Sequence, residues 1–299
     1  MDLVSRVADA YLQTAEGSDA ARLHFLEGLW EIQSHMESAD RHYDPPDAEA
    51  ARDALVSGQP LFLLSAPVVP TAEYAEAASR IACYVSEAAG LSDAQADALR
   101  GVDFAGAVDA ERLAGAVLSP NAFVAEVAND VSAQVGDDLT PATLAFVLIS
   151  ALAPFLTGPS KSARETLGES DGQLWTAGQC PVCGSPASMG RMGESSQLQG
   201  AERALWCGLC HAEWGYERIR CVRCGCRNSD RLRYSHLEGD PAHRLHLCEE
   251  CHGYTRFVFV DDLGKSVSMV VEDAVTATLD AVALAMGYTA TGDAVKGRA

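Results

Sequence analysis

The spacing of apolar residues predicts that the first half of the chain is helical. Apolar side chains from Phe25 to Met36 fall on one face of a helix, and the stretch 71–90 (TAEYAEAASRIACYVSEAAG) repeats that spacing between a threonine and a terminal glycine. The stretches 120–136 (PNAFVAEVANDVSAQVG) and 139–156 (LTPATLAFVLISALAPFL) follow the same pattern, each with a proline at or near its start. Together these stretches predict an α-helical bundle.

The last third of the chain changes its periodicity twice. The stretch 254–271 (YTRFVFVDDLGKSVSMVV) alternates apolar and polar residues on both sides of an Asp-Asp-Leu-Gly turn, which is typical of a β-hairpin. From residue 272 the stretch EDAVTATLDAVALAMGY returns to helical spacing, and Gly287 offers a stop. The sequence leaves open whether this last helix packs on its own domain or on the bundle.

These patterns predict an α+β protein in three parts. The stretch 158–173 (GPSKSARETLGESDGQ) is rich in small and polar residues, so we place the main domain boundary there. Residues 1–168 are expected to form the α-helical domain and residues 174–260 a cysteine-rich module. Residues 261–299 are expected to supply a strand and the C-terminal helix.

Nine of the ten cysteines lie in the cysteine-rich module, and eight of them form four CxxC units. Both pairs of successive units, first with second and third with fourth, enclose 23 residues, and corresponding units lie 41 residues apart. The segments 180–210 and 221–251 therefore read as two copies of one module. The units are Cys180/Cys183, Cys207/Cys210, Cys221/Cys224 and Cys248/Cys251.

The ninth cysteine of the cluster, Cys226, lies outside this repeat. Overlaying the copies pairs CPVCG with CVRCG and CGLCH with CEECH, and it places Cys226 opposite Ser185. The third unit is therefore Cys221/Cys224. We interpret Cys226 as an unreactive free thiol; a nucleophile whose pKa is lowered by nearby arginines is the alternative.

The CxxC spacing is that of a tetrahedral metal site. Two intervening residues let a tight turn aim both sulfurs at one ion, and a glycine after the second cysteine permits a positive φ. The sequence predicts two tandem rubredoxin-like or zinc-ribbon sites, the first unit with the second and the third with the fourth; an interleaved pairing stays open. Four cysteines close the metal shell, so hydrolytic catalysis is not expected. His211 and His252 follow complete pairs and are expected beside the sites.

Two metal ions, iron or zinc, satisfy this ligand set equally well. Zinc would be structural, whereas iron would add a one-electron redox couple. Disulfides would need an oxidising compartment, and the first twenty residues do not resemble a secretion signal. The longest apolar run, 144–156, is shorter than the ~18 residues that cross a bilayer. We therefore expect a cytoplasmic protein with reduced thiols and no membrane insertion.

Charge is distributed unevenly. The segment 176–260 has ten arginines and nine acids, whereas the rest of the chain has twelve basic and thirty-three acidic residues. Such a surface would repel nucleic acid, so no nucleic-acid partner is expected. The arginines that surround the third unit are interpreted as compensation for thiolate charge: Arg218, Arg220, Arg223 and Arg227. The tenth cysteine, Cys83, is expected to be a small buried residue of a helix.

The chain resembles the formate dehydrogenase accessory proteins of the FdhE type. The resemblance rests on CPVCGSPASMG from Cys180, LWCGLCHAEW from Leu205, IRCVRCG from Ile219, CEECHGYTR from Cys248 and the closing EDAVTATLDAVALAMGY. It implies a cytoplasmic protein that associates with the catalytic subunit of respiratory formate dehydrogenase and is needed for its activity. It also implies rubredoxin-like metal sites built from the eight CxxC cysteines.

The favoured hypothesis is a non-enzymatic maturation factor, a chaperone of formate dehydrogenase. One alternative is a rubredoxin-like iron redox protein. Another is a zinc-ribbon nucleic-acid-binding protein, suggested by aromatics interleaved with arginines: Trp206, Trp214, Tyr216 and Tyr234. These aromatics are more simply interpreted as the small core of the ribbons. Self-association is left open by the sequence.

Overall fold

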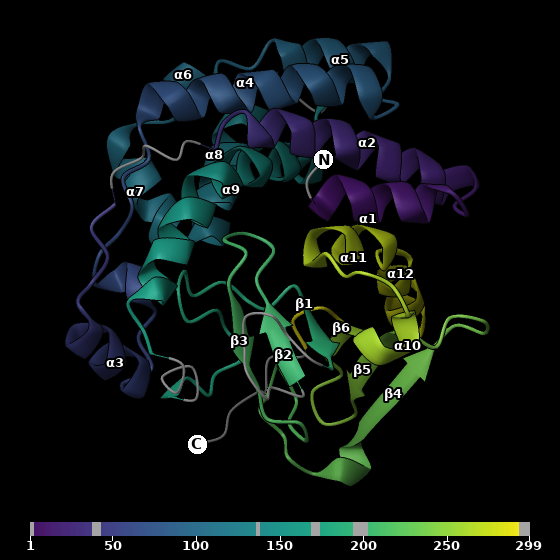
Figure 1. The fold of residues 1–299 in the computed structure, drawn as a ribbon. Coiled ribbons are helices and arrows are strands. Elements are labelled where there is room, and N and C mark those ends of the chain that lie inside the picture. Colours follow the sequence, from purple (N-terminus) through teal and green to yellow (C-terminus); the bar gives the residue numbers. More distant parts are fainter. Residues whose placement is uncertain (1–2, 38–42, 136–137, 169–173, 194–202, 293–299) are drawn as a thin grey trace.

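The computed structural model describes residues 3–37, 43–135, 138–168, 174–193 and 203–292. A layer of helices forms the first half, and a sheet with three further helices forms the second half (Figure 1). The helices of the first half are α1 (Leu3–Leu12), α2 (Gly17–Ser34), α3 (Ala48–Val56), the 3-10 turn η1 (Leu61–Leu63), α4 (Thr71–Ala88), α5 (Asp93–Arg100), α6 (Phe104–Ala107), α7 (Ala110–Leu118), α8 (Pro120–Val135) and α9 (Pro141–Glu165).

Helix α9 is the centre of the helical layer. Thr140 caps its start by accepting a hydrogen bond from the Thr143 N–H at 3.1 Å, and proline follows at the first helical position. Within the described residues, α9 is the one helix that is long and apolar enough to cross a membrane, but 56% of its most apolar window is buried inside the protein. It contacts α2, α4 and α8. The apolar residues of α9 therefore form the core of the helical layer.

The expectation that Cys83 is buried is wrong. Helix α4 does form as predicted, and Gly90 follows it with a φ of 66°. However, its buried face runs through Tyr74, Ala78, Ile81 and Val85. Cys83 lies two residues from Ile81, about 200° around the helix, so it is exposed to solvent.

The two cysteine-bearing copies share one six-stranded sheet. Each copy forms an antiparallel meander of three strands, and the strand order is β3-β2-β1-β6-β5-β4. The copies join where β1 pairs in parallel with β6, so the first strand of one copy lies beside the last strand of the other. The strands are β1 (Met189–Met192), β2 (Arg203–Trp206), β3 (Glu213–Gly215), β4 (Leu232–His236), β5 (His243–Cys248) and β6 (Tyr254–Phe259), with the 3-10 turn η4 (Ser229–Arg231) before β4.

The predicted hairpin across 254–271 is wrong in its second half. Strand β6 forms, but the chain then enters α10 (Val260–Leu263) and α11 (Met269–Val275), and residues 261–292 form no strand beyond a single bridge from Thr289 to Gly253. Val271 packs against α1 and α2, and this contact favours a helix where the local alternation favoured a strand.

The single helix predicted from residue 272 is two helices. Helix α11 ends at Val275, and α12 (Thr278–Ala285) follows after a turn at Thr276 and Ala277. The sequence left open whether this region packs on the helical half or on its own domain, and each of the two helices does one of these. Helix α11 packs on α1 and α2, whereas α12 packs on β5 and β6 (Figure 1). Gly287 ends α12 with a φ of 85°, as predicted.

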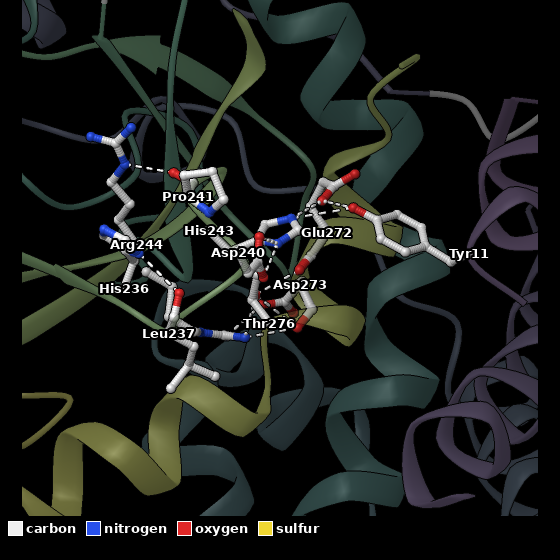
Figure 2. Close-up of polar contacts among 11 residues, drawn as sticks. Tyr11, His236, Leu237, Asp240, Pro241, His243, Arg244, Glu272, Asp273 and Thr276 are labelled. Atoms are coloured by element: carbon white, nitrogen blue, oxygen red, sulfur yellow. Dashed lines mark hydrogen bonds and ion pairs between the residues drawn. The ribbon is translucent and has the colours of Figure 1, made fainter. Parts of the chain in front are cut away.

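A buried polar network ties α1 to the sheet through α11 (Figure 2). His243 at the start of β5 contacts Glu272 of α11 at 2.9 Å and Asp240 at 2.8 Å. Tyr11 of α1 donates its hydroxyl hydrogen bond to Glu272 at 2.7 Å. Burial lowers the pKa of His243, but hydrogen bonds to Asp240 and Glu272 outweigh it and raise the pKa to about 9. A positively charged His243 therefore stabilises a carboxylate that is fully buried.

Candidate metal centres

The eight CxxC cysteines form two clusters. In each cluster the four sulfurs lie within 4.8 Å of one another. In the first cluster the sulfurs lie 3.5 Å apart between Cys180 and Cys210 and 3.6 Å apart between Cys183 and Cys207. In the second cluster the separations are 3.8 Å between Cys221 and Cys251 and 3.7 Å between Cys224 and Cys248. The structure therefore brings the first unit to the second and the third to the fourth, and not the interleaved pairs.

These separations fit a metal ion. A tetrahedron with metal–sulfur bonds of about 2.3 Å has sulfur–sulfur edges of about 3.8 Å. A disulfide would hold two sulfurs about 2 Å apart, and all ten cysteines are free. Each cluster can thus hold one ion with four sulfurs. That the eight cysteines are metal ligands remains a prediction.

In the second cluster the charge on one cysteine sulfur opposes the ionisation of its neighbour. In the second cluster the hydrogen bond from Cys251 lowers the pKa of Cys221 to about 5, and the same contact raises the pKa of Cys251. One thiolate in the cluster therefore makes the next one harder to form. A divalent cation would offset this repulsion. All four thiols could then lose their protons, and metal binding requires them to do so.

The backbone of the CxxC turns explains the sequence around them. Gly184 and Gly225 follow the first and third units with φ values of 76° and 74°, as the spacing predicts. The N–H of Cys221 donates to the carbonyl of Cys226 at 2.8 Å, and Cys180 donates to Ser185 in the same way. The side chain of Cys226 is half-buried beside the second cluster and outside its four-sulfur set. Its carbonyl closes the turn.

The histidines after the second and fourth units share an unusual backbone. His211 and His252 have φ values of 58° and 49°, in a region that side chains rarely adopt. Burial lowers the pKa of His211 to about 4, so it is neutral and stacks on Trp206 at 5.4 Å between ring centroids. Neither histidine belongs to a four-sulfur set. Both lie beside the sites, as expected.

The first cluster belongs to the main core of the protein. All four of its cysteines are buried and pack in the same hydrophobic cluster as α4, α8 and α9. The N–H groups of Leu61 and Phe62 in η1 donate to the carbonyls of Pro181 and Val182 at 2.8 and 2.9 Å. No pattern in the sequence indicates this contact. It ties the first CxxC turn to the helical half.

The second cluster lies apart from that core. Cys221, Cys248 and Cys251 are buried, whereas Cys224 is partly exposed. Its apolar surroundings are small and include Leu232. Two cysteine sets of the same sequence pattern therefore have different environments.

Arginines near the third unit bind backbone carbonyls. The side chain of Arg223 donates to the carbonyls of Tyr254 and Ala187, and Arg220 donates to Thr176 at 2.7 Å. Arg223 also donates its backbone N–H to Cys221 Sγ at 3.3 Å. The contact between Arg223 and Ala187 joins the two copies, so this arginine does more than compensate thiolate charge.

Arg203 of β2 is a structural residue that sequence reasoning missed. It is buried, and one of its nitrogens donates to the three carbonyls of Glu217, Arg218 and Arg220. Its guanidinium also lies 4.6 Å from the centre of the Phe257 ring. Arg203 thereby shapes the loop that leads into the third CxxC unit.

The chain is similar to several FdhE homologs and to one FdhE crystal structure. An FdhE homolog of Stutzerimonas stutzeri is 36% identical over 110 residues, which cover 36% of this chain and 35% of the relative. An FdhE homolog of Pseudomonas aeruginosa is 27% identical over 299 residues, with coverage of 96% and 87%. The crystal structure of the FdhE protein from Pseudomonas aeruginosa matches with a TM-score of 0.60 and 23% identity, and covers 96% of this chain and 92% of that one. No protein-family model matches the chain.

The fold and the clusters define a class of protein: a helical layer on one sheet that carries two closed four-cysteine sets. Within that class, the chain is similar in sequence to FdhE homologs and in fold to the FdhE crystal structure. The match to the first relatives spans about a third of their length, whereas the Pseudomonas aeruginosa homolog extends the similarity over nearly the whole chain.

Proposed function

We propose that this protein is a cytoplasmic maturation factor that binds the catalytic subunit of a respiratory formate dehydrogenase. The observation that carries the proposal is the pair of four-cysteine clusters, within a chain similar to FdhE homologs and to an FdhE crystal structure. A factor of this kind binds its client and is not itself an enzyme. Closed four-sulfur shells support this view, because they leave no position for a substrate or an activated water.

We further propose that each cluster holds one ion of zinc or iron. The ligands would be Cys180, Cys183, Cys207 and Cys210 at the first site, and Cys221, Cys224, Cys248 and Cys251 at the second. Either ion would cross-link strands that are too short to form a stable core alone, and iron would add a one-electron couple. The chain's own contribution is to aim the sulfurs at both sites and to exclude water from those of the first site, which are all buried.

Deletion of the gene tests the proposed function. Loss of formate-dependent dye reduction, restored by the wild-type gene, is expected. Complementation by Cys180→Ser is expected to fail, whereas Cys83→Ser, on an exposed helix face, should restore activity. Undiminished activity in the deletion strain would rule the function out.

Direct binding separates a role as binding factor from an indirect effect on expression. The immature catalytic subunit should co-purify with the full chain from a cytosolic fraction. A chain found only with membranes, or a deletion phenotype without any binding, would contradict the proposed mode of action.

A redox role is the second candidate, favoured by the rubredoxin-like arrangement of four sulfurs. Metal analysis and an absorption spectrum of protein purified without oxygen distinguish the two functions. Zinc at both sites and a colourless solution would eliminate electron transfer by iron. A nucleic-acid role has less support, because Trp206, Trp214 and Tyr216 are buried and only Tyr234 is exposed.

A further inference from the structure

The two copies carry different residues at the position two residues after the last cysteine of each set. Ala212 follows the second unit and Gly253 occupies the corresponding place after the fourth. Both serve the same backbone hydrogen bond: Cys207 donates to Ala212 at 2.9 Å and Cys248 donates to Gly253 at 3.0 Å. The turn itself therefore tolerates alanine. The glycine at position 253 is explained by a contact that is specific to the second cluster.

That contact is made by the segment after α12. Thr289 donates its N–H to the carbonyl of His252 at 2.8 Å and accepts a hydrogen bond from Tyr254 at 3.0 Å. These two bonds place residues 288–292, which we call the C-terminal strap, directly alongside the residues that follow Cys251. The contact is a parallel bridge between Thr289 and Gly253.

The strap then turns over the sulfur of Cys251. The N–H of Gly292 donates to the carbonyl of Thr289, and Gly292 has a φ of 73°. A Cβ atom on Gly292 would lie 3.1 Å from Cys251 Sγ. A Cβ atom on Gly253 would lie 3.1 Å from the same sulfur, 3.1 Å from Gly292 Cα and 2.9 Å from the side chain of Arg223. A side chain at either position would crowd the strap against the sulfur, and the φ of Gly292 also favours glycine.

The helical half covers the first cluster, whereas the strap covers the second. Leu61 and Phe62 fix the first CxxC turn from within the main core, so exposing that cluster requires opening the core. The strap leaves α12 through Met286 and Gly287, which are exposed, and the strap itself is only partly buried. Two backbone hydrogen bonds to the turn and the packing of the partly buried Tyr288 beside His252 hold the strap. These contacts are easier to break than the main core.

We propose that the second four-cysteine site is the exchangeable metal site of the protein and that the C-terminal strap gates it. When the strap detaches, a soft thiol or nitrogen ligand can reach the ion and remove it, and the released thiolates take up protons from solvent. The first site keeps its ion throughout. This inference rests on the proposed metal binding.

Metal transfer from the purified full-length holoprotein to a coloured chelator tests the gate. The wild type should release its ions in two phases of one equivalent each. Gly292→Val and Gly253→Ala, which crowd the strap, should accelerate the fast phase about tenfold and leave the slow phase unchanged. Gly264→Ala is the matched control, because Gly264 also has a positive φ, 67°, but open space around its Cα.

The outcomes separate the two proposals. The double variant Cys221→Ser/Cys224→Ser should retain one equivalent of metal and release it with the slow phase. A wild-type chain with two ions that leave at one rate would overturn the gate while leaving metal binding intact. Acceleration of both phases by Gly292→Val, or equal acceleration by Gly264→Ala, would also overturn it. A chain that binds no metal would overturn the proposed sites and the gate together.

Discussion

The charge on His243 is expected to make the stability of the protein depend on pH. The pKa of His243 rises from 6.5 to about 9 in the folded protein, which corresponds to about 3 kcal/mol of stabilisation. Because the folded pKa lies above the unfolded one, this stabilisation is complete below about pH 6.5 and is lost as the pH rises towards 9. Burial and Glu272 raise the pKa of Tyr11, so its hydroxyl stays protonated and remains a donor.

The substitution His243→Gln tests this prediction. Urea unfolding of metal-saturated protein, followed by tryptophan fluorescence, gives the free energy of unfolding from pH 6 to pH 9.5. The difference between wild type and His243→Gln should shrink by about 3 kcal/mol across that range. His24→Gln is the control, because His24 is exposed and pairs with Glu27 in a surface contact. A wild-type minus His243→Gln difference that does not change with pH would refute a charged, buried His243.

Two further substitutions test the packing that positions the clusters. Gly190→Ala in β1 should destabilise the protein by at least about 1–3 kcal/mol, because its Cβ would lie 2.2 Å from the Phe257 ring; thermal unfolding should show no such loss for Gly215→Ala, which meets open space. Phe62→Ala should cost about 3–5 kcal/mol in urea unfolding, because Phe62 is buried beside the first CxxC turn, whereas Leu63→Ala, at an exposed position, should change stability little. Equal losses in either pair would contradict the packing described.

The duplicated spacing made the candidate site largely predictable. Equal gaps between the CxxC units predicted the pairing, and the overlay predicted the place of Cys226 opposite Ser185. These features are local, because a CxxC turn needs only its own residues and a positive φ after them. The helices of the first half were predictable for the same reason, since their apolar spacing matches the face that they bury.

Features that depend on distant contacts were not predictable. The stretch that contains Val271 alternates like a strand, and only its contact with α1 and α2 selects a helix. Nothing local indicates that β1 pairs with β6 in parallel and joins the copies in one sheet. The one sequence feature related to the strap is the glycine at position 253, where the first copy has Ala212. This difference can be interpreted only once the structure shows Gly292 next to Cys251.

The metal content of the purified chain tests the central claim most directly. Mass spectrometry of metals, together with native protein mass, should find two ions per wild-type chain and one in Cys180→Ser/Cys183→Ser. Cys226→Ser should keep both ions, since its side chain lies outside the second set. A wild-type chain that is fully folded without bound ions would contradict the account.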